Sequence, residues 1–163
     1  MRIKKHPALH LTYCLNVHPG ETWAENLAAI REYAMAVKAR VAPDRPFGLG
    51  LRVSDQASES LADDGARREA LAFFQSNNLY AFTINGFPFG RFHGGPVKES
   101  VYQPDWRTAE RRDYTNRLAD LLAFFLPEGV RGSISTVPCS FKPWIKNEAD
   151  VSLMMERLLE CVA

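Results

Sequence analysis

The chain has 163 residues, of which 46% are hydrophobic and 24% are charged, and its formal net charge is +1. These values are typical of one globular domain with a real core, and the spread of Lys and Arg along the chain argues against a nucleic-acid partner. No apolar run approaches the ~20 residues of a membrane span, and the basic start lacks the apolar stretch of a signal peptide. The three cysteines, Cys14, Cys139 and Cys161, lack C-x-x-C spacing, so we expect a reducing cytoplasm rather than a disulfide scaffold.

An apolar and aromatic run over residues 9–17 predicts a first strand, which ends at His18-Pro19-Gly20. Thr22 and Glu25 have the spacing of a capping box, the arrangement in which each residue satisfies a backbone amide of the other. Behind them, apolar residues recur at helical intervals from residue 23 to residue 41. This pattern predicts a long first helix.

Strand and helix patterns continue to alternate along the rest of the chain. The predicted elements are a strand over 47–53, a weaker helix over 58–75, a strand over 79–84, a helix from about 108 to 126, a strand over 132–137 and a helix over 151–162. Parallel strands joined by amphipathic helices predict an α/β fold.

Two architectures are compatible with this alternation. A doubly wound sheet of four or five strands can be built from this chain alone. The helical pattern is still present at Leu158, Leu159 and Val162, where the sequence ends, and an eight-unit TIM barrel needs about 250 residues. We therefore expect residues 1–163 to be the N-terminal half of a single TIM-barrel domain, with about four of the eight β/α units and truncation within the fourth helix.

The longest irregular segment follows the third predicted strand, from Asn85-Gly86 to Thr108. Irregular loops beyond roughly 12–15 residues are usually either functional or disordered. This one contains Phe87, Phe89 and Trp106 among other aromatic residues, and disordered segments are poor in aromatics. It is predicted to be an ordered lid or pocket wall.

Ligands of parallel α/β folds bind at the carboxyl ends of the strands. The candidate substrate-binding residues near the four predicted strand ends are Asn16, His18, Arg52, Asn85, His93 and Lys142. Each also has a purely structural interpretation. His18 can be a turn residue and Lys142 a surface side chain, whereas a buried Arg52 needs either an ion pair or an anionic ligand.

The same strand ends offer few metal ligands, namely His18, Glu21, Asp55 and His93, and none of them has helix-face ligand spacing. This set is too small for a complete metal site. A divalent metal, if the full-length protein uses one, would need most of its ligands from a missing half. The residues identify no catalytic group.

Six segments, in order along the chain, resemble the family of the metabolite traffic protein EboE. They are residues 10–23, 46–54, 79–93, 101–107 and 132–138 and the motif Phe141-Lys-Pro-Trp144. The resemblance implies a xylose isomerase-like TIM barrel that contributes to the handling or export of a small-molecule precursor. It also implies partner proteins encoded in the same gene cluster.

Family members are roughly twice as long, and their second half carries acidic and histidine-bearing strand ends that look like metal-binding positions. This chain has none of these strand ends. The alternative function is therefore a divalent-metal-dependent sugar isomerase or epimerase whose metal ligands lie mostly in a missing C-terminal half. A third possibility is a fragment without activity of its own, which we expect to self-associate through exposed sheet edges.

Overall fold

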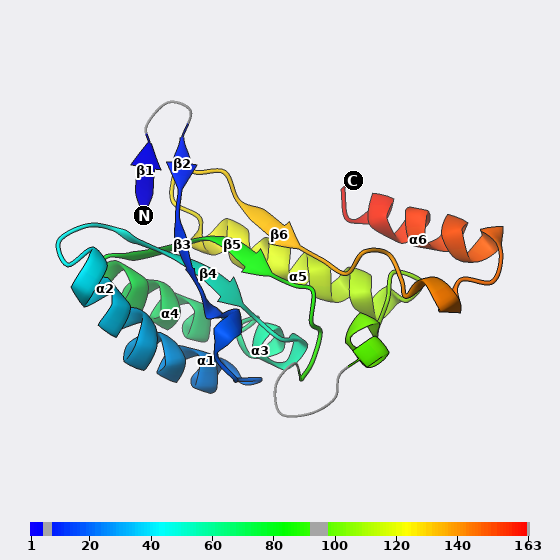
Figure 1. The fold of residues 1–163 in the computed structure, drawn as a ribbon, viewed down its shortest axis with the longest axis horizontal. Helices are drawn as coiled ribbons and strands as arrows, with labels where there is room; N and C mark the ends of the chain where they lie inside the picture. Colours follow the sequence, from blue (N-terminus) through cyan, green and yellow to red (C-terminus); the bar gives the residue numbers. More distant parts are fainter. Residues whose placement is uncertain (5–7, 92–97, 163) are drawn as a thin grey trace.

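The computed structural model describes residues 1–4, 8–91 and 98–162 and contains one four-stranded parallel sheet (Figure 1). Its strands, neighbours in chain order, are β3 (Thr12–Cys14), β4 (Phe47–Arg52), β5 (Leu79–Asn85) and β6 (Ser133–Ser135). A small antiparallel pair, β1 (Arg2–Lys4) and β2 (Leu9–His10), precedes this sheet and was not predicted. The predicted α/β fold with parallel strands is confirmed.

Within the described residues, six α-helices connect or follow these strands. They are α1 (Trp23–Ala29), α2 (Met35–Val41), α3 (Asp55–Ser60), α4 (Asp64–Ser76), α5 (Ala109–Phe125) and α6 (Glu148–Glu160). A π-helical segment, Ile30–Ala34, joins α1 to α2, so the two form the continuous helix that the sequence predicts. Thr22 caps it as expected: its Oγ1 accepts from the Glu25 amide at 3.2 Å, and Glu25 Oε2 accepts from the Thr22 amide at 2.9 Å.

The sequence prediction also differs from the structure in the first strand and in the helix expected over 58–75, and the bounds of β6 and α6 differ from the predicted 132–137 and 151–162. The first strand was expected over 9–17, but the chain is already 3-10 helical at Leu15–Val17. The single helix expected over 58–75 is two helices, because Ser54 caps α3 and Asp63 caps α4. The carboxylate of Asp63 accepts from the Ala66 amide at 2.8 Å, which starts a new helix in the middle of the predicted one.

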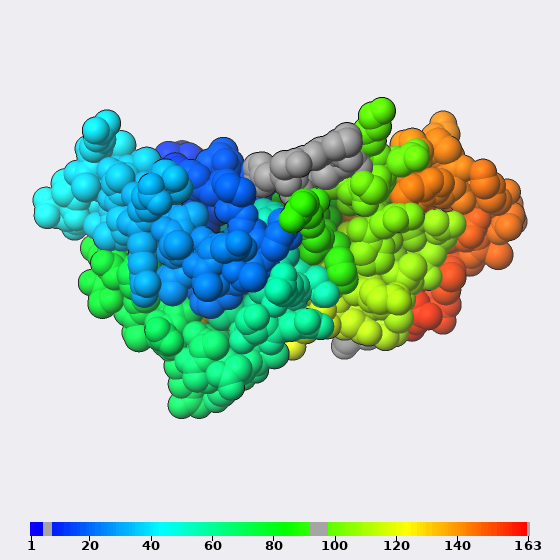
Figure 2. Space-filling model, turned by 90° about the horizontal axis from the view of Figure 1, so that it is seen from below, coloured from blue at the N-terminus to red at the C-terminus, as the bar shows by residue number. Residues whose placement is uncertain are grey.

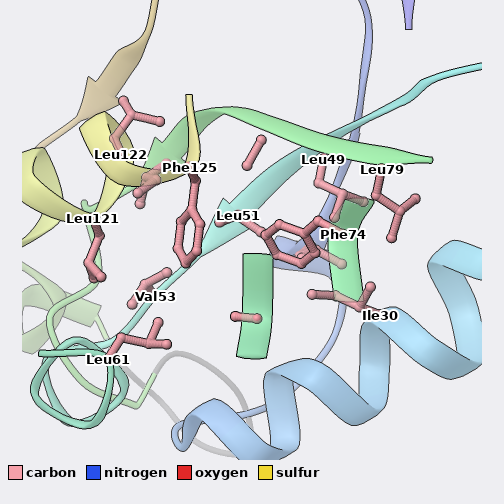
Figure 3. Close-up of a cluster of buried hydrophobic side chains, with 14 of the residues drawn as sticks. Ile30, Leu49, Leu51, Val53, Leu61, Phe74, Leu79, Leu121, Leu122 and Phe125 are labelled. Atoms are coloured by element: carbon pink, nitrogen blue, oxygen red, sulfur yellow. The ribbon is translucent and has the colours of Figure 1, made fainter. Parts of the chain in front are cut away.

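One face of the sheet carries the main hydrophobic core. Leu49, Leu51 and Val53 are at most 1% exposed, and their side chains meet those of Phe74 from α4 and Phe125 from α5 (Figure 3). Burying each such side chain stabilises the fold by about 1.5–3 kcal/mol. Helices α1 to α5 all contribute to this side of the molecule, and Figure 2 shows them as one continuous surface.

The last helix lies apart from this core. Figure 1 shows α6 beyond the carboxyl end of β6, beside the start of α5. Met154 anchors α6 in a small cluster with Trp106 and Val137, and Arg112 Nη1 donates to Glu160 Oε2 at 2.6 Å. In the part of the chain that is described, we find no helix with the length and hydrophobicity needed to cross a membrane.

Candidate functional site

The face of the sheet opposite the core carries small polar side chains toward the carboxyl ends of its strands and the stacked rings of Tyr80 and Phe82 at its other end. Strand residues alternate between faces, so the register places Gly50 of β4 on the side opposite Leu49 and Leu51. A Cβ atom at Gly50 would lie 3.1 Å from Thr12 Oγ1 and 3.5 Å from Thr83 Cγ2, so both threonines lie on that side. We call this surface the polar face. Its residues are Thr12, Cys14, Thr83, Asn85, Ser133 and Ser135.

Two side-chain hydrogen bonds connect β5 to β6 across the polar face. Ser133 Oγ donates to Thr83 Oγ1 at 2.9 Å, and Ser135 Oγ donates to Asn85 Oδ1 at 2.8 Å. Both serines are exposed, whereas Thr83 and Asn85 are half-buried. The face therefore offers a row of hydroxyl and amide groups that solvent reaches from the β6 side.

Arg52 ends β4 next to Asn85, its register partner, but its side chain is already paired. It is 1% exposed, and Nη2 lies 2.8 Å from Glu21 Oε1 and 2.8 Å from the Gly90 carbonyl. Nη1 donates to the Gly20 carbonyl. The sequence left two partners open for Arg52, a carboxylate of the chain or an anionic ligand. The structure shows the ion pair with Glu21.

The segment after β5 is held in place by its backbone carbonyls. The Gly86 carbonyl accepts from Arg111 Nη1 at 2.8 Å, and the Phe89 carbonyl accepts from the Asp55 amide at 2.8 Å. Each bond ties the loop to a helix on the core side. Residues 86–91 thus form a fixed wall at the carboxyl end of the sheet, and the predicted site residue His93 lies outside the described residues.

His18 and Asn16 lie at the other edge of the sheet. A ring nitrogen of His18, Nε2, is 2.7 Å from the Tyr13 hydroxyl, and its ring stacks on Tyr33 with centroids 4.3 Å apart. Tyr13 pairs in register with Leu49 and packs against the core, so His18 lies on the helical side of β3. Asn16 is half-buried in the 3-10 segment that follows β3.

Lys142 is exposed in a 3-10 helix, Lys142–Trp144, in the orange segment that leads into α6 (Figure 1). Of the predicted site residues that are described, the structure brings Arg52 and Asn85 together as register partners. It places His18 on the helical side of β3. Ligand binding by any of these residues stays a prediction.

Asp55 and Asp105 each form an ion pair with an arginine, but their pKa values are shifted in opposite directions. Burial raises the pKa of Asp55 at the start of α3, although Arg117 forms an ion pair with it. Burial acts in the same direction on Asp105, but hydrogen bonds from Arg107 and Ser140 outweigh it and lower the pKa of Asp105. Arg107 Nη2 is 2.8 Å from Asp105 Oδ2. Asp105 therefore serves as a structural anion.

The hydroxyl groups of Thr83 and Ser133 were missed in the sequence, although a signal for them exists. Polar residues alternate with Ile84 in β5 and with Ile134 in β6, the period-two pattern of a strand with one polar face.

Within the described ranges, no three side chains of His, Cys, Asp and Glu are grouped closely enough to hold a metal ion. Comparisons with models of known families, with curated proteins and with solved structures found no match.

Proposed function

We propose that this chain forms one wall of a xylose isomerase-like TIM-barrel pocket that binds a small, polar, uncharged metabolite in the cytoplasm. The role is that of an EboE-like protein in the handling or export of a precursor. The observation that carries this proposal is the polar face. Its hydroxyl and amide groups lie at the carboxyl end of β5, from Thr83 and Asn85, and along the short neighbouring parallel strand β6, from Ser133 and Ser135.

The strand order supports the barrel. The four strands follow one another in chain order without reversal, and the core that packs against helices α1 to α5 lies on one side of the sheet. Right-handed crossovers that always add the next strand on the same side produce this arrangement. A doubly wound sheet instead reverses its strand order and carries helices on both faces.

The chemistry of the polar face supports binding. Hydroxyl and amide groups donate and accept hydrogen bonds, so they suit a ligand that is itself rich in hydroxyl groups. General acid–base catalysis relies on side chains such as His, Glu, Asp, Lys or Tyr, and Tyr80 of β5, whose hydroxyl lies 2.9 Å from His10 Nδ1, is at the opposite end of this face from the candidate groups. We find no observation in the described residues that favours the metal-dependent isomerase.

A titration with xylitol, a neutral polyol, tests this proposal by amide chemical shifts in NMR spectra. We expect shifts to concentrate at residues 83–85 and 133–135, and citrate, an anion of similar size, to give none there. The double variant Thr83→Val with Ser133→Ala removes one rung of hydroxyl groups and should abolish the response. Ser60→Ala, which removes an exposed hydroxyl on α3, is the matched control and should keep it. Shifts confined to other surfaces would contradict the proposed pocket.

A further inference from the structure

Large apolar side chains that are exposed concentrate in two places. The first group, which we call the hairpin patch, lies on β1, β2 and the residue before β3 and consists of Ile3, Leu9 and Leu11, with exposed fractions of 50–55%. The second group, which we call the α6 patch, consists of Val151, Met155, Leu159 and Val162, with exposed fractions of 46–83%. Contiguous exposed apolar surface on a folded protein marks an interaction site.

The α6 patch is a continuous stripe. Val151, Met155 and Leu159 follow one another at intervals of four along the helix, which places them on one side, and Val162 lies two residues beyond the end of α6. The buried Met154 lies on a different side of α6, where it packs against Trp106. A shallow depression runs along the stripe and includes Glu156. The helix is therefore fixed to its own chain by one side and presents a second apolar side to solvent.

The two patches carry opposite charge. Arg2 and Lys4 are exposed on β1, and the first acidic residue of the chain is Glu21. Glu148 and Glu156 are exposed on α6. An apolar surface flanked by positive charges attracts a surface flanked by negative charges and repels another positively flanked one. The hairpin patch therefore fits an α6 patch better than it fits a second hairpin patch.

The positions of the patches favour a closed pair. Figure 1 shows the β1–β2 hairpin above the left part of the molecule and α6 at its right end, and Figure 2 shows the C-terminal segment in orange and red beside the helical surface. A two-fold axis makes every contact between two copies reciprocal, so a hairpin patch that meets the partner's α6 patch is matched by a second contact of the same kind. A two-fold arrangement closes, whereas a single head-to-tail contact repeated without closure gives an open chain.

We propose that a second copy of this chain docks on these two patches and forms a closed two-fold dimer. In this dimer each hairpin patch contacts the partner's α6 patch. This assembly needs no ligand, so it can be tested independently of the proposed function.

Sedimentation equilibrium and light scattering of the ligand-free chain measure the assembly. We expect twice the 18.4 kDa mass of one copy at micromolar concentration. Leu159→Glu and Leu11→Glu each place a charge in one patch and should give monomers with an unchanged circular dichroism spectrum. Val41→Glu is the matched control: Val41 is 58% exposed, outside both patches, and this variant should remain a dimer. A monomeric wild-type chain, or a Leu159→Glu variant that remains dimeric, would overturn the proposal, and a series of larger species would overturn its closed symmetry.

Charge reversal tests the pairing of the patches without touching their apolar residues. Lys4→Glu and Glu156→Lys should each weaken the dimer about tenfold, because each places like charges across both contacts. The variant that carries both substitutions restores opposite charges and should dimerise like wild type. If the two losses instead add in the double variant, the hairpin patch does not contact the α6 patch.

Discussion

Arg52 and Glu21 form an ion pair that joins the carboxyl end of β4 to the segment after β3, with 2.8 Å between Nη2 and Oε1. The arginine is 1% exposed, and it also satisfies the carbonyls of Gly20 and Gly90. Arg52→Met removes all of these contacts at once and leaves buried acceptors without a donor. We expect a loss of about 3–5 kcal/mol in the free energy of unfolding, measured by urea denaturation.

The control for this substitution is Arg68→Met. Arg68 pairs with Asp64 one helical turn away, and its side chain is 73% exposed. Exposed pairs of this kind contribute about 0.3–0.5 kcal/mol, so the urea midpoint should hardly move. Equal effects of the two substitutions would show that the Arg52 pair does not hold the strand end together.

Gly48 marks a close approach between β4 and the N-terminal segment. A Cβ atom at this position would lie 2.6 Å from the Leu11 carbonyl oxygen and 2.6 Å from the Met1 nitrogen. Gly48→Ala must therefore shift the backbone at Met1 and Leu11, before β3, and we expect it to cost about 1–3 kcal/mol. Gly90→Ala, where the added Cβ has no neighbour within 4 Å, should be neutral or slightly stabilising. Thermal unfolding measures the melting temperatures of both variants, and we expect a lower value for Gly48→Ala than for Gly90→Ala. Equal melting temperatures would contradict the close approach at Gly48.

The lowered pKa of Asp105 makes part of the stability depend on pH. The folded state binds this proton less readily than the unfolded chain, so the contribution is fully present above the unfolded pKa of about 3.9 and is lost as the pH falls through the folded value. Asp105→Asn weakens the hydrogen bonds from Arg107 and Ser140 and should cost about 1.5–3 kcal/mol at pH 7. The difference from wild type should shrink below about pH 4.

Unfolding at a series of pH values measures this difference. Asp44→Asn changes an exposed aspartate and serves as the control, with no expected loss at either pH. A difference between Asp105→Asn and wild type that stays constant down to pH 2 would show that the carboxylate charge of Asp105 is not what stabilises the fold.

Much of the fold could be predicted because local signals and tertiary packing agree. The capping box at Thr22 and the apolar β4 are visible in the sequence and present in the structure. The break between α3 and α4 was missed because the Asp63 cap lies within a weakly helical pattern. The β1–β2 pair was missed because two very short strands give no periodic signal.

The candidate site was harder to predict than the fold, since contacts between distant segments determine it. Nothing local to Arg52 indicates that Glu21 and the Gly90 carbonyl will pair with its guanidinium. His18 follows a strand end as expected, yet its contact with Tyr33 turns it to the helical side. A search of the predicted strands for polar residues at every second position would have found Thr83 and Ser133. Successive side chains of a strand point to opposite faces, whichever strand lies beside it.

Tyr114 of α5 connects the helical layer to the end of β4. Its hydroxyl donates to the Val53 carbonyl at 2.5 Å, and its side chain is fully buried. Tyr114→Phe leaves that carbonyl without this donor at almost unchanged packing, so we expect a loss of about 1–3 kcal/mol at pH 7. Tyr33→Phe, at a 43% exposed tyrosine, should stay within about 0.5 kcal/mol of wild type.

Burial also raises the pKa of the Tyr114 hydroxyl, which gives a second measurement. Above the unfolded pKa of about 10 the unfolded chain releases this proton while the folded state retains it, so stability falls as the pH rises. Tyr114→Phe lacks the group and escapes this loss. The stability difference between wild type and Tyr114→Phe should therefore narrow between about pH 9 and pH 11 in urea unfolding experiments. A difference that is constant over this range would place the Tyr114 hydroxyl in contact with solvent, contrary to its burial under β4.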